Sequence, residues 1–167
     1  MRTDQRASFV EYVTSRGPWM LQVALRLCRD RHNAEDLVQT SQTKLYAHWT
    51  KLFAIDNLDA YVRTIILRTY IGNQRTGWAK RVDLFPTHED LPTAEGIDHE
   101  TRMLLRNAVE GLAPRQRATI LMRYYYDMSV EQTAAALHIT AGTVKSQTSR
   151  GLDTLRTALE KTEQRAA

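Results

Sequence analysis

Apolar residues recur three or four positions apart over most of this 167-residue chain, and they form two blocks. In the first block, up to about residue 78, this spacing includes Leu37, Val38, Leu45 and Trp49. The spacing returns from about residue 100 and continues to Leu155. Because side chains at this spacing share one face of a helix, the pattern predicts amphipathic helices in both blocks.

Local signals divide the first block into separate helices. Gly17-Pro18 predicts a break between the first two helices, because proline lacks the backbone N–H that a helix interior uses. Asn33 is predicted to cap the next helix, with Glu35 and Asp36 in its first turn. A short loop at residues 53–59 then precedes a helix that is expected to begin near Ala60.

The stretch between the two blocks, residues 79–99, has a different character. It contains Pro86, Pro92 and Gly96, shows little apolar periodicity and carries more acidic than basic residues. This composition is typical of a linker. The sequence therefore predicts an all-α protein with two small helical domains, residues 1–78 and 100–167, joined by a flexible acidic linker at residues 79–99.

The second block contains a pattern typical of a helix-turn-helix. Ser129 can cap a helix over Val130–Leu137, residues 138–140 can form a tight turn, and Thr140 can cap a second helix. His138 stands in the turn where glycine is usual, which puts a left-handed backbone conformation at this position in doubt.

The second helix of this motif has a polar, cationic outward face. At about 100° per residue, a cluster lies on the opposite side, formed by Val144, Thr148, Gly151, Leu152 and Leu155. The outward residues are Ser146, Ser149 and Arg150, with Lys145 and Gln147 on the flanks. Arg and Lys can reach guanine edges or phosphates in the major groove, and Gln can reach adenine. This favours a DNA-reading helix, and the solvated face of an ordinary bundle is the alternative.

Composition narrows the class of protein without identifying a ligand. The chain is 43% apolar and 25% charged with seven Gly and four Pro, which favours a helical globular protein over a disordered or all-β one. Its formal net charge of +4 favours an anionic partner. The single cysteine, Cys28, excludes an intramolecular disulfide and is interpreted as a buried small apolar residue.

Several functions have no support in the sequence. No segment has the pattern of a signal peptide or a membrane span, so we expect a soluble, cytoplasmic protein with no membrane partner. The five histidines are scattered, and no His-Glu-x-x-His motif, Gly-rich phosphate loop or nucleophile elbow occurs. We therefore expect no catalytic residues, no metal site and no cofactor, in a protein that is not an enzyme.

Several stretches resemble two regions of bacterial sigma factors. Residues 112–118 (LAPRQRA), 122–129 (MRYYYDMS) and 142–152 (GTVKSQTSRGL) resemble sigma region 4. Residues 32–39 (HNAEDLVQ) resemble the region 2 segment that grips core RNA polymerase, and residues 60–71 (AYVRTIILRTYI) resemble the helix that reads and melts the near promoter element. With no sequence for regions 1 and 3, the chain resembles an extracytoplasmic-function (group IV) sigma factor of the actinobacterial SigE-like type.

This resemblance implies a subunit that joins core RNA polymerase at its clamp and flap regions and directs it to promoter DNA. Polymerase binding is assigned to Glu35, Asp36, Leu37 and Gln39. Contacts with the minus-10 element are assigned to Tyr61, Arg63, Arg68, Asn73 and Arg75. The loop at residues 53–59 is expected to capture a base flipped out of that element. Contacts with the minus-35 element are assigned to Lys145, Ser146, Gln147, Ser149 and Arg150.

Other residues of the second block keep two interpretations. Arg115, Arg117 and Arg123 are either phosphate anchors or part of a solvated helix face. Of the three tyrosines at positions 124–126, one or two are expected in the core, because consecutive residues point in different directions on a helix.

Two rival functions would use the same helix-turn-helix. A free-standing regulator would bind its own operator without joining polymerase, but it has no need of the motif at residues 33–39. An antagonist that binds sigma partners without DNA is disfavoured by Lys145 and Arg150.

The chain ends in Ala166-Ala167, which resembles the end of the tag recognised by AAA+ proteases such as ClpXP. We hypothesise regulated turnover through these two residues. No sensor domain is evident in the sequence. Control is therefore expected from a separate protein such as an anti-sigma factor, from transcription or from proteolysis.

Overall fold

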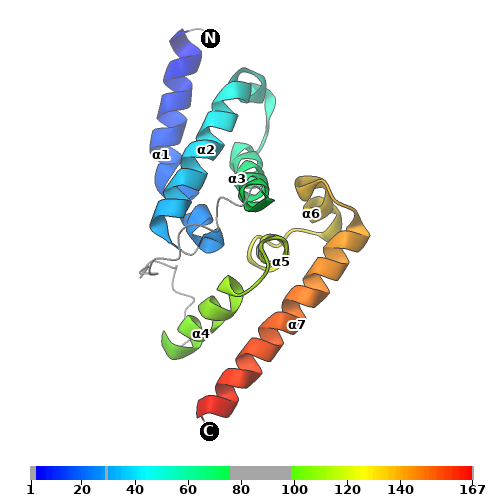
Figure 1. Ribbon diagram of the computed structural model, residues 1–167. Coiled ribbons are helices and arrows are strands. Elements are labelled where there is room, and N and C mark those ends of the chain that lie inside the picture. Colours follow the sequence, from blue (N-terminus) through cyan, green and yellow to red (C-terminus); the bar gives the residue numbers. More distant parts are fainter. Residues whose placement is uncertain (1–2, 29, 76–98, 167) are drawn as a thin grey trace. The chain divides into compact units, whose positions relative to one another are not determined.

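The computed structural model describes residues 3–28, 30–75 and 99–166, and every regular element in these ranges is helical (Figure 1). The all-α prediction is confirmed. The chain divides into two compact units, Met1–Leu91 and Pro92–Ala167. The linker predicted at residues 79–99 lies outside the described residues except for His99, which begins a helix.

Three helices and a short 3-10 helix build the first unit. They are α1 (Thr3–Leu27), α2 (Arg31–His48), η1 (Trp49–Ala54) and α3 (Leu58–Arg75), and the three α-helices contact one another. The apolar stripe predicted on α2, which includes Leu37, Val38 and Leu45, is buried, and it meets apolar residues of the other two helices. These are Met20, Val23, Ala24 and Leu27 of α1, and Val62, Ile66, Leu67 and Tyr70 of α3. The core of the unit forms where these three stripes meet.

The predicted helix break at Gly17-Pro18 is wrong, because α1 is continuous through Pro18. A proline inside a helix removes one backbone N–H and so leaves the carbonyl four residues earlier, that of Thr14, without its helical donor. Thr14 and Pro18 both lie on the exposed side of α1, where water can bond that carbonyl instead. Tyr12 and Met20, on either side of the proline, are both held against the rest of the unit.

The helices α2 and α3 both begin earlier than predicted. The N-cap of α2 is Asp30, whose carboxylate accepts the Asn33 backbone N–H at 2.9 Å, so Glu35 falls beyond the first turn. In α3, the side-chain oxygen of Asn57 accepts the Ala60 backbone N–H at 2.9 Å. Aspartate and asparagine cap equally well, so Asp30 can take the place predicted for Asn33. Cys28, directly after α1, forms no disulfide and is half-buried, not buried as predicted.

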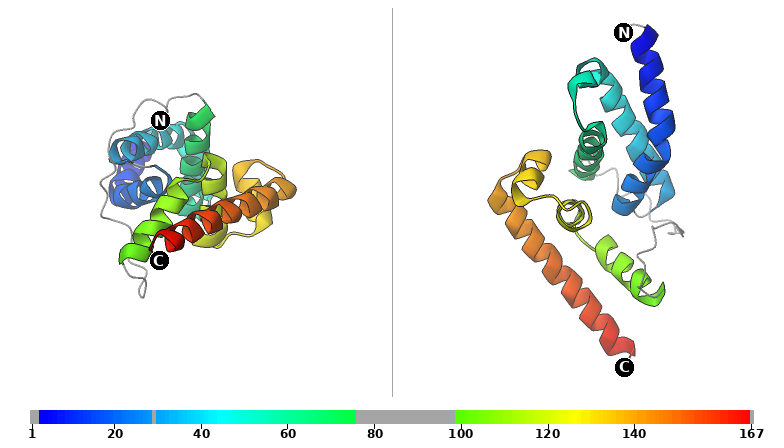
Figure 2. Two further views of the ribbon diagram at one scale, coloured as in Figure 1. Left: turned by 60° about the horizontal axis from the view of Figure 1, so that its bottom comes forward. Right: turned by 180° about the vertical axis from the view of Figure 1, so that it is seen from behind.

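The second unit is built around one long helix. Its elements are α4 (His99–Glu110), α5 (Pro114–Ile120), the π-helical turn η3 (Leu121–Tyr125), α6 (Val130–Leu137) and α7 (Ala141–Ala166). The helices α4, α5 and α6 all contact α7 (Figure 2). A core cluster joins Ala108 and Leu112, at the end of α4 and just after it, to Ile120 of α5 and Leu155 of α7. The unit therefore depends on the buried face of α7.

The predicted caps of the helix-turn-helix are confirmed. Ser129 and Gln132 form a capping box at the start of α6, in which the Ser129 hydroxyl accepts the Gln132 N–H at 3.0 Å and the Gln132 side chain accepts the Ser129 N–H at 2.8 Å. At the start of α7, the Thr140 hydroxyl accepts the Thr143 N–H at 3.1 Å. Both signals are local in sequence, which is why they could be read from it.

His138 adopts the left-handed conformation that the sequence put in doubt, with φ 53° and ψ 47°. Its N–H bonds to the Ala135 carbonyl at 3.4 Å, and the next N–H, of Ile139, bonds to the Ala134 carbonyl at 3.0 Å. This is the Schellman pattern that closes a helix, and its hydrogen bonds offset the strain of a side chain at positive φ.

Gly151 lies on the face of α7 that packs against α5. A Cβ atom at this position would lie 2.9 Å from Cγ1 and 3.2 Å from Cδ1 of Ile120, closer than carbon atoms ordinarily pack. The missing side chain is what lets the two helices approach this closely.

We therefore expect Gly151→Ala to lower the free energy of unfolding by about 1–3 kcal/mol relative to Gly142→Ala, because the added methyl group displaces Ile120. Gly142, on the same helix, has only the Thr140 hydroxyl oxygen nearby, 3.8 Å from the added carbon, so Gly142→Ala is the matched control. Urea unfolding followed by circular dichroism measures the difference. Equal stabilities of the two variants would show that the Ile120 side chain moves aside without lowering the free energy of unfolding.

Candidate nucleic-acid and protein interfaces

The N-terminal half of α7 has a polar face opposite its buried stripe. Of the residues predicted to face inward, Val144, Gly151 and Leu155 are buried, and Thr148 and Leu152 are half-buried. Of the five residues expected to read DNA, Gln147 on the flank is half-buried. The other four are exposed: Lys145, Ser146, Ser149 and Arg150. The structure thus brings all five to the outward side of one helix.

The two cations of this face are available to an anionic partner. Within the described residues, neither Lys145 nor Arg150 forms an ion pair or a side-chain hydrogen bond. Ser146 donates to the Thr143 carbonyl of its own helix at 3.0 Å. Because no internal bond has to break first, the ammonium and guanidinium groups can bind phosphates or base edges directly.

Of the three arginines considered as phosphate anchors, Arg117 is not at the surface. It is 4% exposed and donates to the carbonyls of Val109 at 3.0 Å, of Leu112 at 3.3 Å and of Glu110. Its guanidinium therefore caps the C-terminal end of α4, where a positive charge suits the helix dipole. Both sequence interpretations of Arg117 are wrong.

The other two arginines differ from each other. Arg115 is exposed, so the phosphate-anchor interpretation stands for it. Arg123 is half-buried, donates to the Met128 carbonyl and lies 6.0 Å from the centre of the Tyr124 ring. That guanidinium holds the segment between η3 and α6.

The tyrosines at 124–126 do not enter the core as predicted. Tyr124 is 57% and Tyr125 52% exposed, and Tyr126 is half-buried with its ring 4.9 Å from that of Tyr125. The π-helical turn explains the difference, because the Tyr126 N–H bonds to the Leu121 carbonyl five residues earlier, at 2.9 Å. The wider turn changes which residues face inward, and Leu121 with Met122 fills the core instead.

On α2, three of the four residues assigned to polymerase binding are accessible. Glu35 and Gln39 are exposed and Asp36 is half-buried, whereas Leu37 is 2% exposed. Leu37 is therefore a core residue that supports this surface and cannot contact a partner directly. Two acidic groups of the surface already have neighbours on the same helix: Glu35 lies 2.7 Å from Arg31, and Asp36 lies 3.7 Å from His32.

The five residues assigned to the minus-10 element do not share one face. Tyr61 and Arg68 are half-buried and lie about two turns apart on the same side of α3. Arg63 points elsewhere, with its guanidinium 5.9 Å from the centre of the Trp19 ring on α1. Asn73 lies about a third of a turn away from Tyr61 around the helix. Arg75 ends α3, and its side chain lies outside the described residues.

Arg68 is a partly buried cation on α3. Burial lowers the pKa of its guanidinium, and Tyr61 opposes the shift. A partly buried cation has lost some of its hydration, and a phosphate beside it would replace what was lost.

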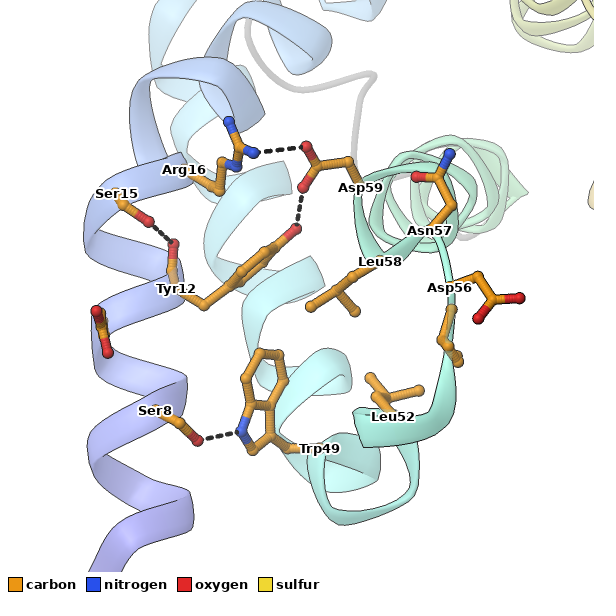
Figure 3. A pocket seen from close by; sticks show the side chains of 12 residues that line it. Ser8, Tyr12, Ser15, Arg16, Trp49, Leu52, Asp56, Asn57, Leu58 and Asp59 are labelled. Carbon is orange, nitrogen blue, oxygen red and sulfur yellow. Dashed lines mark hydrogen bonds and ion pairs between the residues drawn. The ribbon is translucent and has the colours of Figure 1, made fainter.

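The loop expected at residues 53–59 is shorter in the structure, where only residues 55–57 are irregular. It borders an open groove of about 810 Å³ between α1, η1 and the start of α3 (Figure 3). Tyr12, Trp49 and Leu58 line the groove, and Asp56 and Asn57 lie on the loop at its edge. The size and the aromatic wall of this groove suit a planar ligand such as a base.

Polar contacts from α1 hold both sides of this groove. The Tyr12 hydroxyl donates to Asp59 at 2.8 Å, and the Arg16 guanidinium lies 3.1 Å from the same carboxylate. The Trp49 indole N–H donates to the Ser8 hydroxyl at 3.1 Å. Sequence reasoning missed Tyr12 and Arg16, because Tyr12 is separated from Asp59 by 47 residues and no motif relates them.

Tyr12 is the titratable group most affected by this arrangement. Burial, then the hydrogen bond to Asp59 and that residue's charge, raise the pKa of the Tyr12 hydroxyl above its ordinary value of 10.0, and the Arg16 charge opposes the shift. The hydroxyl therefore remains a hydrogen-bond donor across the physiological pH range.

Within the described ranges, no group of three or more His, Cys, Asp or Glu side chains is placed to hold a metal ion. None of the described helices is both long enough and apolar enough to cross a membrane.

Comparison with known families matches both units. Residues 12–79 match "Sigma-70 region 2", and residues 102–155 match "Sigma-70, region 4". The first match includes α2, α3 and most of the residues that line the groove, and the second includes the helix-turn-helix.

Individual relatives match over most of the chain. The RNA polymerase sigma-E factor of Streptomyces avermitilis is 40% identical over 158 residues, which are 91% of this chain and 85% of that protein. The ECF RNA polymerase sigma factor SigL of Mycobacterium tuberculosis is 30% identical over 142 residues, 82% of this chain and 80% of that one. A solved structure of the sigma factor RpoE in complex with the anti-sigma factor NepR, from Bartonella quintana, is 25% identical with a TM-score of 0.67 and covers 92% of this chain and 97% of that one.

The Tyr12–Asp59 contact predicts a dependence of stability on alkaline pH. The folded chain holds the Tyr12 proton more tightly than the unfolded chain does, so its contribution to the free energy of unfolding is complete below about pH 10 and declines as the pH rises further. Tyr12→Phe removes this contribution, so its stability should fall less than that of the wild type between about pH 9 and about pH 11. Tyr46→Phe, which removes an exposed hydroxyl in the same unit, is the control for urea titrations. Parallel pH profiles for wild type and Tyr12→Phe would contradict the expectation.

Proposed function

The chain belongs to the sigma-70 family of RNA polymerase sigma factors, in its extracytoplasmic-function group, and from this we propose how its surfaces share the work of promoter recognition. A sigma factor is a transcription initiation factor: it binds core RNA polymerase and directs it to specific promoters. It is not itself an enzyme. Membership of this family excludes the free-standing regulator that the helix-turn-helix alone would allow.

Polymerase binding is proposed for the exposed side of α2. Glu35, Asp36 and Gln39 offer two carboxylates and an amide beside one another, which suits a basic surface such as a clamp helix. The pairs with Arg31 and His32 are solvent-exposed and therefore weak, so a partner's cations can replace them. Leu37 contributes by holding this helix against the core.

Minus-10 recognition is proposed for α3 and the loop before it. Tyr61 and Arg68 share a side on which DNA phosphates can lie, and Arg75 continues the basic character to the end of the helix. Arg63 and Asn73 point to other sides, so their contribution would be indirect. The groove beside residues 55–57 is proposed to receive a base flipped out of the element, because stacking and edge hydrogen bonds there offset the loss of base stacking.

Minus-35 recognition is proposed for the outward face of α7, with Arg115 as a phosphate anchor. We further propose residues 1–78 and 100–167 as the two functional domains and residues 79–99 as their linker. Each domain alone would bind DNA weakly. Tethering on polymerase raises the effective concentration of the second contact once the first has formed.

The observation that carries the DNA-binding part of the proposal is the face of α7 on which Lys145 and Arg150 are exposed and their side chains form no ion pair or hydrogen bond within the described residues. The experiment is to mix the purified protein with sigma-free core RNA polymerase and transcribe a pool of genomic promoters. We expect discrete transcripts whose start sites share minus-10 and minus-35 sequences. DNA binding without polymerase engagement would contradict the proposal.

In the same assay, Arg150→Ala should weaken binding to a selected promoter by about 1–3 kcal/mol at its minus-35 contact. Arg156→Ala is the matched control, since Arg156 is exposed on the same helix and lies 3.3 Å from Asp153. If Arg150→Ala and Arg156→Ala kept the same affinity and promoter selectivity, the reading face would lie elsewhere.

Control by an anti-sigma factor is proposed because the similar RpoE of Bartonella quintana is bound by one in its solved structure. As a polymerase subunit, the protein would act in the cytoplasm, and at the nucleoid when bound to polymerase. The flap region of polymerase is proposed as the partner of the second unit.

Turnover by an AAA+ protease such as ClpXP is proposed through Ala166-Ala167. The helix α7 extends to Ala166, and Ala167 lies outside the described residues. Replacing both alanines with aspartate should lengthen the half-life of the protein in cells, because the two small terminal residues resembling a degradation tag are lost. Pulse-chase measurement with a Gln164→Asp control tests this, and unchanged decay would end the hypothesis.

A further inference from the structure

Asp59 is held by two side chains of α1 at the point where the loop of residues 55–57 enters α3. Its carboxylate accepts the Tyr12 hydroxyl on one oxygen at 2.8 Å and lies 3.1 Å from the Arg16 guanidinium on the other (Figure 3). Both partners come from one face of α1, and the close-up shows them reaching across to the carboxylate. The first turn of α3 is thereby tied to α1.

The hydrogen bonds described for the loop lie at its two ends. The Ile55 N–H bonds to the Leu52 carbonyl at 3.1 Å, and the Asn57 side chain is engaged in capping α3. Asp56 and Asn57 are exposed. The place of the loop over the groove is therefore set at its two ends, by η1 on one side and by Asp59 on the other.

We infer that Tyr12 and Arg16 are positioning residues for base capture, which fix the loop of residues 55–57 through Asp59 before DNA arrives. The inference rests on the proposed function, in which this loop receives a flipped base. A loop held in its binding geometry loses less conformational freedom when the base enters, so the affinity for that base is higher. Tyr12 and Arg16 act on the base only through Asp59 and the loop.

The core of the unit does not depend on these contacts. The arginine side chain is 51% exposed and the aspartate side chain 32% exposed. Beyond Pro18, α1 is anchored by Met20, Val23 and Leu27, which are all buried. Variants at Tyr12 and Arg16 should therefore fold, and their effect on the loop can be measured.

The experiment uses holoenzyme formed with core RNA polymerase and a fluorescent promoter fragment. Its non-template strand carries an abasic site at each minus-10 position in turn. With wild-type protein, the position whose base is captured is the one at which the abasic site weakens binding most. We expect Tyr12→Phe and Arg16→Gln to weaken binding to intact DNA by about threefold to tenfold. On DNA abasic at the captured position they should match the wild type, because no base then uses the loop.

Tyr46→Phe is the matched control, since it removes an exposed hydroxyl elsewhere in the same unit, and it should behave as the wild type on both DNAs. Equal weakening of intact and abasic DNA by the Tyr12 and Arg16 variants, or no weakening by either, would overturn the inference while base capture stands. If an abasic site weakened DNA binding by the wild-type holoenzyme at none of the minus-10 positions, base capture itself would fail and the inference would fail with it. Asp59→Asn gives a further check. The amide keeps an oxygen that can accept the Tyr12 hydroxyl but no longer carries the negative charge that attracts Arg16, so this variant should lose as much affinity for intact DNA as Arg16→Gln does.

Discussion

Burial of one stripe on each helix is the constraint on which both units depend. A helical unit of this size hides only about 60% of the surface that its unfolded chain exposes, so its core needs nearly every large apolar side chain it has. Leu37 and Val144 show the consequence. Leu37 is buried next to the half-buried Asp36, and Val144 is buried next to the exposed Lys145, and both polar neighbours belong to the proposed binding surfaces. A change that moved either stripe around its helix would disrupt the core and the proposed binding surface together.

Polar contacts then hold particular helix ends in place on the packed core. Apolar surfaces attract without direction, whereas hydrogen bonds to a charged group have a preferred geometry. In the second unit, the buried guanidinium of Arg117 gathers the carbonyls at the end of α4 and so sets the turn into α5. In the first unit, Asp59 does the same between α1 and α3. Both units thus combine an apolar core with a charged group that joins helix ends.

How far the sequence predicts the structure depends on the range of the interactions involved. The caps at Ser129 and Thr140 and the stripes of α2 and α7 are local patterns, and the sequence predicts them correctly. Features that depend on packing were missed: α1 continues through Pro18, Arg117 is buried, and η3 widens into a π-helix. The groove was also missed in part. The loop beside it was expected, but Tyr12 and Arg16 come from a distant helix that no motif connects to Asp59.

The position of α7 in the second unit has a consequence for local unfolding. This helix is the last element of the chain, and α4, α5 and α6 all pack against it. Fraying of this helix from its carboxyl end would withdraw Ala158, then Leu155 and then Leu152 from the core cluster. Each turn lost would leave the other helices of the unit with less to pack against.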